Sequence, residues 1–199
     1  MPINHNHRYF GLNSLSLEAA VQEVQQRLGL SLGPSHSDKS SSAASMDATF
    51  YPQFSERIRT DAERMARNYI LFYSLENAIR DLIDDVLFDA IGPDWWEEPD
   101  VVPEPVHKNA DKNKKKEDGT GVTPRSDRML DYTNFGELGE IIKSNWTNFG
   151  DIFRDRRAVE RIIANLNTLR ASIAHCTALS EDEELRLHLS LRDWFRQQA

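Results

Sequence analysis

The stretch VERIIANLNTLRASIAH, residues 159–175, contains the most regular hydrophobic pattern of the chain. Its apolar residues recur at offsets of 0, 3, 4, 7, 10 and 14 positions: Val159, Ile162, Ile163, Leu166, Leu169 and Ile173. This spacing follows the period of an α-helix and places all these side chains on one stripe. We therefore predict a long amphipathic helix that packs this stripe into a core.

A second and longer helical pattern runs from about Phe54 to Ile91 and stops at Gly92-Pro93, a pair typical of a helix end. Its stripe comprises Met65, Tyr69, Phe72, Ile79, Ile83 and Val86. This second helix is long enough to run beside the first one, so the two should share a core.

The remaining ordered segments also favour helices. Apolar residues between positions 138 and 153 suggest one or two short helices that break near Gly150. Ser180 and Glu183 have the spacing of a capping box and should begin the last helix. The chain contains no useful run of alternating apolar residues, the pattern of a strand. We predict an all-α, up-and-down helical bundle.

Two segments interrupt the helical patterns. Residues 1–50 contain a short helical pattern followed by a Ser-rich stretch, residues 31–45, which we interpret as a flexible linker. Residues 97–128 carry an acidic block and then a lysine-rich block, and we expect a long, charged, disordered loop insertion there. The bundle itself should span residues 51–199.

Composition excludes several classes of protein. The chain has 199 residues, a formal net charge of -8 and a single cysteine, Cys176, which rules out an intramolecular disulfide framework. No apolar run is long enough for a membrane helix, and the first residues lack the pattern of a signal peptide, so we expect a cytoplasmic protein. His5 and His7 are close together, but no cluster has metal-ligand spacing, so we expect no metal and no cofactor.

Two charges fall on the apolar stripes. On a helical wheel, Glu76 lies about 20° from Met65 and Arg170 lies about 20° from Val159. An unpaired charge on an inward face is costly, so we predict that Glu76 forms an ion pair with Arg170. The pair either fixes the register of the two helices or orients a guanidinium whose other donors face a cleft and suit a phosphate.

His175 follows Arg170 by five positions, which places the two side chains about 140° apart on a straight helix. Both can face one cleft only if the helix ends between them or if two chains contribute. A histidine at a helix C-terminus is stabilised in its charged form, which moves its pKa towards neutral pH. Such a histidine is either a helix cap or a proton-transfer group.

Arg170 and His175 form an R-x-x-x-x-H motif, and the motif resembles that of HEPN domains, small helical bundles of prokaryotic defence, toxin-antitoxin and RNA-processing systems. The resemblance extends over residues 54–199. It includes the helix with Glu76, Asn77 and Arg80, the Gly92-Pro93-Asp94-Trp95-Trp96 stop, the segment 132–138 and the Glu-rich helix start after Ser180. This setting looks like the HEPN subfamily attached to a eukaryotic PIN-type RNA endonuclease.

The resemblance implies a metal-independent endoribonuclease, acting as a toxin or defence effector. The ribose 2'-OH would attack the phosphate and leave a 2',3'-cyclic phosphate end. Arg170 and His175 would be catalytic, with Glu76, Ser172, Asn77 and Arg80 in support. The site would lie in the cleft of a homodimer, and a cognate antitoxin or defence-complex protein would be a possible partner.

Two features bear on the choice between catalysis and binding alone. Residues 151–170 contain five arginines and three acidic residues. Four of the arginines are candidate RNA-binding residues: Arg154, Arg156, Arg157 and Arg161. The other interpretation is that these arginines form a solvated helix face. Ala171 follows the motif arginine, where active members commonly have a polar residue. The alternative function is therefore a non-catalytic HEPN-like module that binds RNA or a partner protein.

The last helix carries apolar residues on two faces. Leu185, Leu189 and Phe195 mark one face, and Leu187, Leu191 and Trp194 mark the other. Two apolar faces suggest two partners, namely the core and a second chain, unless the helix is buried on all sides within one bundle.

Overall fold

The computed structural model describes residues 49–198. The predicted N-terminal helix, the Ser-rich linker, His5 and His7 lie outside the described residues. The chain divides into two compact units, Met1–Phe54 and Ser55–Ala199. In the first unit the described part contains a short 3-10 helix, η2 (Tyr51–Gln53), which the amide of Phe54 closes by donating to the carbonyl of Tyr51.

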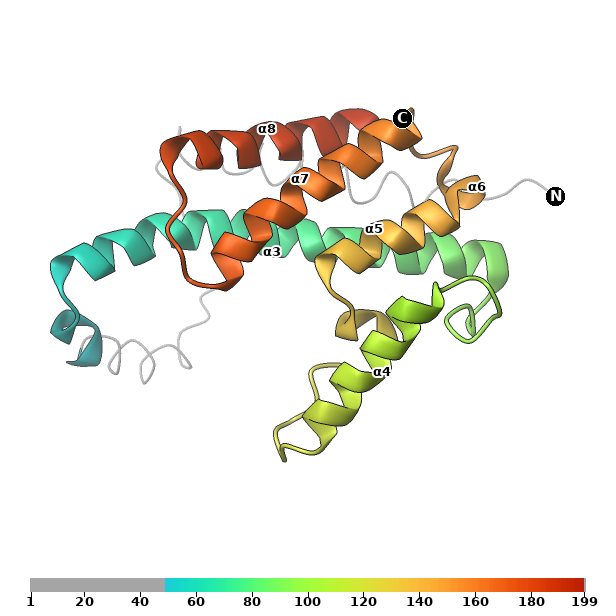
Figure 1. The fold of residues 1–199 in the computed structure, drawn as a ribbon, viewed down its shortest axis with the longest axis horizontal. Helices are drawn as coiled ribbons and strands as arrows, with labels where there is room; N and C mark the ends of the chain where they lie inside the picture. Colours follow the sequence, from blue (N-terminus) through green and yellow to red (C-terminus); the bar gives the residue numbers. More distant parts are fainter. Residues whose placement is uncertain (1–48, 199) are drawn as a thin grey trace, which may run out of the picture. The chain divides into compact units, whose positions relative to one another are not determined.

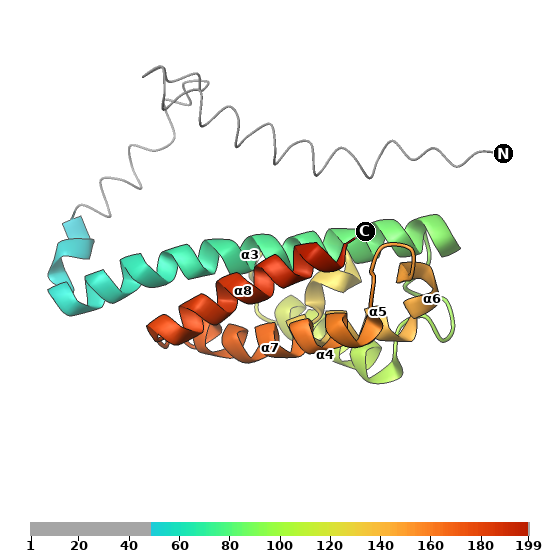
Figure 2. The ribbon, with the colours of Figure 1, turned by 90° about the horizontal axis from the view of Figure 1, so that it is seen from above.

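The second unit is all-helical, which confirms the predicted fold class (Figure 1). Its elements are α3 (Glu56–Ile91), α4 (Glu104–Asp118), η3 (Met129–Tyr132), α5 (Phe135–Ser144), α6 (Trp146–Phe149), α7 (Arg156–Ala174) and α8 (Glu181–Gln197). Within residues 49–198 the one β-type pairing is an isolated bridge between Phe153 and Gln198. Helix α3 forms one layer, and α5, α7 and α8 pack along it (Figure 2).

The core lies between α3 and the opposing helices. The α7 stripe is buried as predicted at Val159, Ile162, Ile163, Leu166 and Leu169, while Ile173 is partly buried at its edge. On α3 the buried apolar residues are Phe72, Leu75, Ile79, Ile83 and Leu87. The prediction was wrong for Tyr69, which is 57% exposed and lines a cavity instead of packing into the core.

The predicted disorder of residues 97–128 is also wrong, because the segment contains α4. Val106 and Ala110 lie four positions apart on this helix and are buried. Four of its five lysines are exposed, and the fifth, Lys114, lies over the Tyr132 ring. The side chain of Asn145 donates a hydrogen bond of 2.8 Å to the carbonyl of Val101 and fixes the start of the segment. The charged composition concealed a short amphipathic helix whose apolar stripe has only two members.

The last helix begins as the sequence predicted. The Glu183 amide donates to Ser180 Oγ, and Glu183 Oε2 accepts from the Ser180 amide at 3.0 Å, which completes the capping box. Hydrogen bonding from the Ser180 backbone lowers the pKa of Glu183. Leu187 and Trp194 of α8 are buried, whereas Leu185, Leu189 and Phe195 remain exposed, so within one chain α8 has one buried face and one open face.

Helices α5 and α7 approach closely at Gly139. An added Cβ at this position would lie 2.8 Å from Cγ2 of Ile163. We expect Gly139→Ala to lower the free energy of unfolding by about 1–3 kcal/mol, although alanine is the better helix former by about 1 kcal/mol. Urea unfolding measures the change.

Gly136→Ala is the matched control for Gly139→Ala. It lies on the same helix, where an added Cβ would come within 3.2 Å of the side-chain tip of Asn167, which is exposed and free to move. We therefore expect a smaller loss for Gly136→Ala. A Gly139→Ala protein as stable as the wild type would contradict the tight contact between α5 and α7.

The helices of residues 49–198 include none that is both long and apolar enough to cross a membrane.

Candidate functional site

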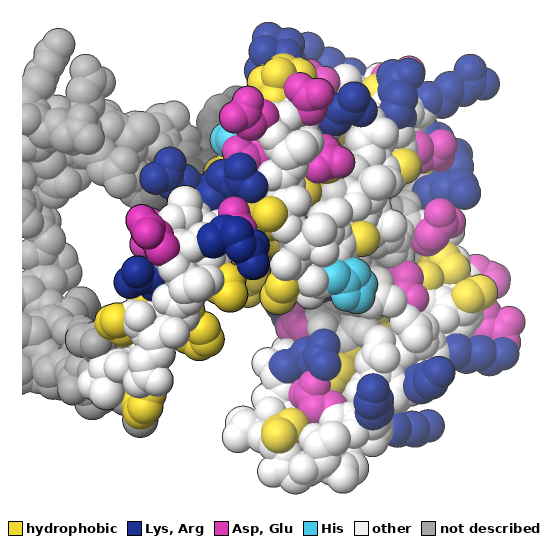
Figure 3. Space-filling model, turned by 60° about the vertical axis from the view of Figure 1, so that its left-hand side comes forward, with side chains coloured by type: hydrophobic (Ala, Val, Ile, Leu, Met, Phe, Trp, Pro, Cys, Tyr) yellow, Lys and Arg dark blue, Asp and Glu magenta, His cyan; other side chains and the backbone are white. Residues whose placement is uncertain are grey.

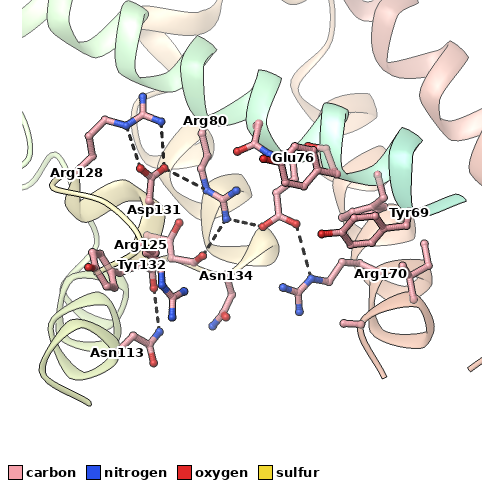
Figure 4. A pocket seen from close by; sticks show the side chains of 16 residues that line it. Tyr69, Glu76, Arg80, Asn113, Arg125, Arg128, Asp131, Tyr132, Asn134 and Arg170 are labelled. Carbon is pink, nitrogen blue, oxygen red and sulfur yellow. Dashed lines mark hydrogen bonds and ion pairs between the residues drawn. The ribbon is translucent and has the colours of Figure 1, made fainter. Parts of the chain in front are cut away.

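A cavity of about 470 Å³ opens between α3, η3 and the C-terminal part of α7 (Figure 4). Helix α3 contributes one face to it, because Tyr69, Tyr73, the adjacent pair Glu76 and Asn77, and Arg80 recur every three or four positions. The other walls comprise Asn113, Arg125, Arg128, Asp131, Tyr132, Thr133, Asn134, Arg170, Ile173 and Ala174, with Phe72 at the base. Four of the lining residues are arginines and two are acids, so the cavity is basic in a chain that is acidic as a whole.

Glu76 is at the centre of the charged network. Its Oε1 accepts a hydrogen bond from Arg80 Nη2 at 2.5 Å, and its Oε2 lies 3.8 Å from Arg170 Nε. The predicted ion pair between Glu76 and Arg170 is therefore confirmed. The closer partner of Glu76 is Arg80, whose Nη2 also donates to the carbonyl of Thr133 and whose Nε lies 3.9 Å from Asp131 Oδ1.

Arg170 differs from Arg80 in how its guanidinium is used. Arg80 is buried and has partners on three sides, whereas the Arg170 side chain is 37% exposed. Among the residues that the structure describes, Glu76 is its one charged partner, through Nε. The two terminal nitrogens extend past Glu76 into the cavity (Figure 4). Two parallel N–H donors in one plane match two oxygens of a phosphate.

Arg128 stabilises the side of the cavity that η3 forms. It makes a bidentate contact with Asp131, with both N–O distances at 3.1 Å, and Nη1 also donates to Asp81 and Asp84 of α3 at 3.2 and 3.3 Å. These hydrogen bonds, led by those to Asp131, raise the pKa of Arg128 above its usual range. With its donors engaged by carboxylates, Arg128 joins η3 to α3 and does not serve as a free cation.

Arg125 is the second arginine directed to the cavity. Its Nε donates to Glu117 Oε2 at 2.6 Å, and its guanidinium carbon lies 5.0 Å from the centre of the Tyr132 ring. The hydrogen bond from the Arg125 amide lowers the pKa of Glu117, which stays ionised beside it. Burial, with the charge of Glu117, raises the pKa of Tyr132. Tyr132 therefore remains a neutral hydrogen-bond donor at neutral pH.

The sequence reasoning missed Arg125 and Arg128 because it placed both in a disordered insertion. One signal was present: Asp131 follows Arg128 by three positions, a spacing that suits a local ion pair in a helical turn.

His175 lies outside the lining of this cavity. Helix α7 ends at Ala174, and His175 is its exposed C-cap, with its amide donating to the carbonyl of Ala171. Cys176 then adopts a φ of 54° and turns the chain away. The helix does end between Arg170 and His175, as one sequence interpretation required, but this end alone does not bring the imidazole into the cavity.

The supporting residues predicted from sequence divide into two groups. Glu76, Arg80 and Asn77 line the cavity, and the side-chain amide of Asn77 donates to the carbonyl of Tyr73 at 2.8 Å. Ser172 lies outside the lining, because it is two positions from Arg170 and so faces another side of α7.

The four arginines predicted to bind RNA lie at the other end of α7. Arg154, Arg156, Arg157 and Arg161 are exposed, and Arg157 is about 20 Å from Arg170 along the helix axis. Arg156 pairs with Glu160 at 2.9 Å, and Arg161 lines a separate cavity of about 190 Å³ beside α8. The fold does not bring this group together with Arg170.

On the face drawn in Figure 3, Lys and Arg side chains are interspersed with Asp and Glu. Residues 49–198 contain no cluster of three or more His, Cys, Asp or Glu side chains that is able to hold a metal ion.

A comparison with protein families matches residues 71–197 to a family model described as Swt1-like HEPN. The matched range includes α3 from its second half onward, α4, α5, α6, α7 and all of α8, and it covers more than half of the chain. Comparisons with curated proteins and with solved structures find no match.

Proposed function

Because this chain belongs to the Swt1-like HEPN family, we propose that it is a metal-independent endoribonuclease that binds an RNA phosphate at Arg170. We propose further that it acts as a toxin or defence effector. The observation that carries the proposal is how Arg170 is held. Glu76 contacts Nε on one edge of its guanidinium, and the other edge faces a basic cavity.

The residue types supply the chemistry of RNA transesterification. The 2'-OH attacks the adjacent phosphorus, and His175 takes its proton. The bond from phosphorus to the 5'-oxygen then breaks, and that oxygen takes a proton from the protonated imidazole of His175 or from water as it leaves. Arg170 stabilises the additional negative charge on the phosphorane. The products are a 2',3'-cyclic phosphate and a 5'-OH, and DNA is spared because it lacks the nucleophile.

A second copy of the chain would complete this site. His175 of one copy lies outside the cavity that contains its own Arg170, so we propose that two motifs face each other across a two-fold axis and that each cavity receives an imidazole from the other copy. The open face of α8, with Leu185, Leu189 and Phe195 exposed, offers apolar surface to a second copy or to an antitoxin or defence partner.

A second candidate function is a non-catalytic module that binds RNA or a partner protein through the same cavity. Two observations favour it: His175 is outside the cavity, and position 171 next to the motif arginine is an alanine. The two functions differ in whether bound RNA is cut.

We expect purified protein to cleave tRNA or total RNA in excess EDTA, because the substrate supplies its own nucleophile. The new ends should be 2',3'-cyclic phosphate and 5'-OH, which end-specific labelling detects. An RNA with deoxyribose at the cleaved nucleotides is the control and should stay intact. Cleavage that needs added Mg²⁺, or that also cuts DNA, would reject this mechanism, and binding without cleavage would support the non-catalytic module.

A further inference from the structure

Two tyrosine rings stand exposed beside the cavity. Tyr69 is 57% exposed and Tyr73 is 58% exposed, and their ring centres are 5.9 Å apart with an angle of 33° between the planes. Both line the cavity. The core of α3 does not depend on them, because Phe72, Leu75 and Ile79 fill it from the other side of the helix.

The rings lie on the same face of α3 as the residues that hold Arg170. Tyr73 precedes Glu76 by three positions, about 4.5 Å along the helix axis, and Glu76 contacts Arg170. Tyr69, Tyr73 and Arg170 all line the cavity, and Figure 4 labels Tyr69 and Arg170 among its lining side chains. An aromatic surface on α3 and the terminal nitrogens of a guanidinium on α7 therefore line the same cavity.

This combination matches the two parts of a nucleotide. An exposed aromatic face stacks on a nucleobase of any identity, and the neighbouring guanidinium binds the phosphate that is attached to it. Stacking on a side chain requires a base that is free of its neighbours, which duplex RNA does not offer.

We propose that Tyr69 and Tyr73 form a stacking platform for an unpaired base, so that the cavity selects single-stranded RNA. This inference rests on the proposed function, since it assigns a base site next to the Arg170 phosphate site. The surroundings of the rings favour a nucleic acid over a protein partner: the cavity beside them is lined by Asn77, Arg170 and other polar groups, whereas the open face of α8 is apolar.

The test compares RNA binding by the full chain and by tyrosine variants. The probes are a fluorescent single-stranded 2'-O-methyl oligonucleotide, which resists cleavage, and a blunt duplex of the same sequence. We expect Tyr69→Leu and Tyr73→Leu each to weaken binding of the single strand about 5- to 100-fold, with duplex binding changed less than about twofold. Tyr73→Phe, which keeps the ring, should retain more affinity than Tyr73→Leu.

Phe88→Leu is the matched control, because Phe88 lies on the same helix, is 54% exposed and is outside the cavity lining. Unchanged binding in the leucine variants, or an equal loss for both probes, would overturn the platform. A loss that follows dissociation of the dimer, measured by sedimentation, would also overturn it and would assign the rings to a protein interface.

The proposed function is tested separately by cleavage of unmodified RNA. If the wild type cuts RNA but the leucine variants bind the single strand as tightly as it does, the platform fails and the nuclease proposal stands. If the wild type neither binds nor cuts any RNA, both proposals fail.

Discussion

Replacing Arg170 by alanine is expected to lower the rate of RNA cleavage about 100- to 1,000-fold, because the phosphorane loses its charged donor. The fold should tolerate the change. The Arg170 side chain is partly exposed, its contact with Glu76 is 3.8 Å, and Glu76 keeps its shorter bond to Arg80. Arg170→Lys should restore only part of the rate, since an ammonium cannot contact two phosphate oxygens at once.

The matched control for Arg170→Ala is Arg192→Ala. Arg192 is also a helical arginine paired with an acid, Asp193, but it is exposed on α8 outside the cavity. Cleavage by the Arg192 variant should equal that of the wild type. An Arg170→Ala protein that is folded and cuts RNA at the wild-type rate would remove Arg170 from the catalytic site.

His175→Ala should lower the cleavage rate about 100- to 10,000-fold, the range for loss of a general acid or base. Because His175 is exposed and outside its own cavity, a mixture of the Arg170→Ala and His175→Ala chains distinguishes one-chain from two-chain sites. If each cavity takes its imidazole from the other copy, random mixed dimers contain one intact site, and the mixture should recover about one quarter of the wild-type activity.

No recovery in that mixture, with subunit exchange verified, would mean that Arg170 and His175 act within one chain. That result would require α7 to end differently in the RNA complex, with the chain after Ala174 moving towards the cavity.

Glu76→Ala is expected to lower the free energy of unfolding by about 2–4 kcal/mol, because it leaves the guanidinium of Arg80 buried with fewer partners. Arg80 is 9% exposed, and without Glu76 it retains the carbonyl of Thr133 at 3.3 Å and Asp131 at 3.9 Å. Because these contacts remain, the loss in the free energy of unfolding should be smaller than for a buried charge without any partner. Urea or thermal unfolding measures it.

Glu160→Ala is the matched control, since Glu160 and Arg156 also pair across one helical turn, at 2.9 Å, but at the exposed surface. We expect a loss of about 0.5 kcal/mol or less for this variant. If Glu76→Ala and Glu160→Ala lowered the free energy of unfolding equally, the proposed cost of leaving Arg80 buried without Glu76 would be contradicted. Glu76→Gln should be milder in stability than Glu76→Ala, yet it should still reduce cleavage because the carboxylate that orients Arg170 is gone.

Several features of the site followed from the sequence. The stripe of α7 and the inward placement of Glu76 and Arg170 depend on helical periodicity, which is visible within one segment of chain. The cost of a buried charge then predicted their pairing, and the two residues do meet. The capping box of Ser180 and Glu183 is local in the same way.

The sequence reasoning missed one local contact: Arg80 follows Glu76 by four positions, and the helical turn between them brings the two side chains within hydrogen-bond distance, so Arg80 competes with Arg170 for Glu76. Other features were not accessible from the sequence. Tyr69 fits the apolar stripe by its position, but it is exposed because it lines a cavity instead of packing into the core. The burial of a side chain depends on which segments pack against its helix, and the sequence of that helix alone does not predict them.

The sequence by itself determined the helical class of the protein, the core stripe of α7, part of the core stripe of α3 (Phe72, Ile79 and Ile83) and the pair at the centre of the site. The tertiary structure alone decided that α4 and η3 form a wall of the cavity, that Arg125 faces into it and that His175 stays outside it. The physical reason is the range of the interactions. Helical periodicity and capping arise between residues within four positions of each other, whereas a cavity exists only where segments distant in the chain meet without filling the space between them.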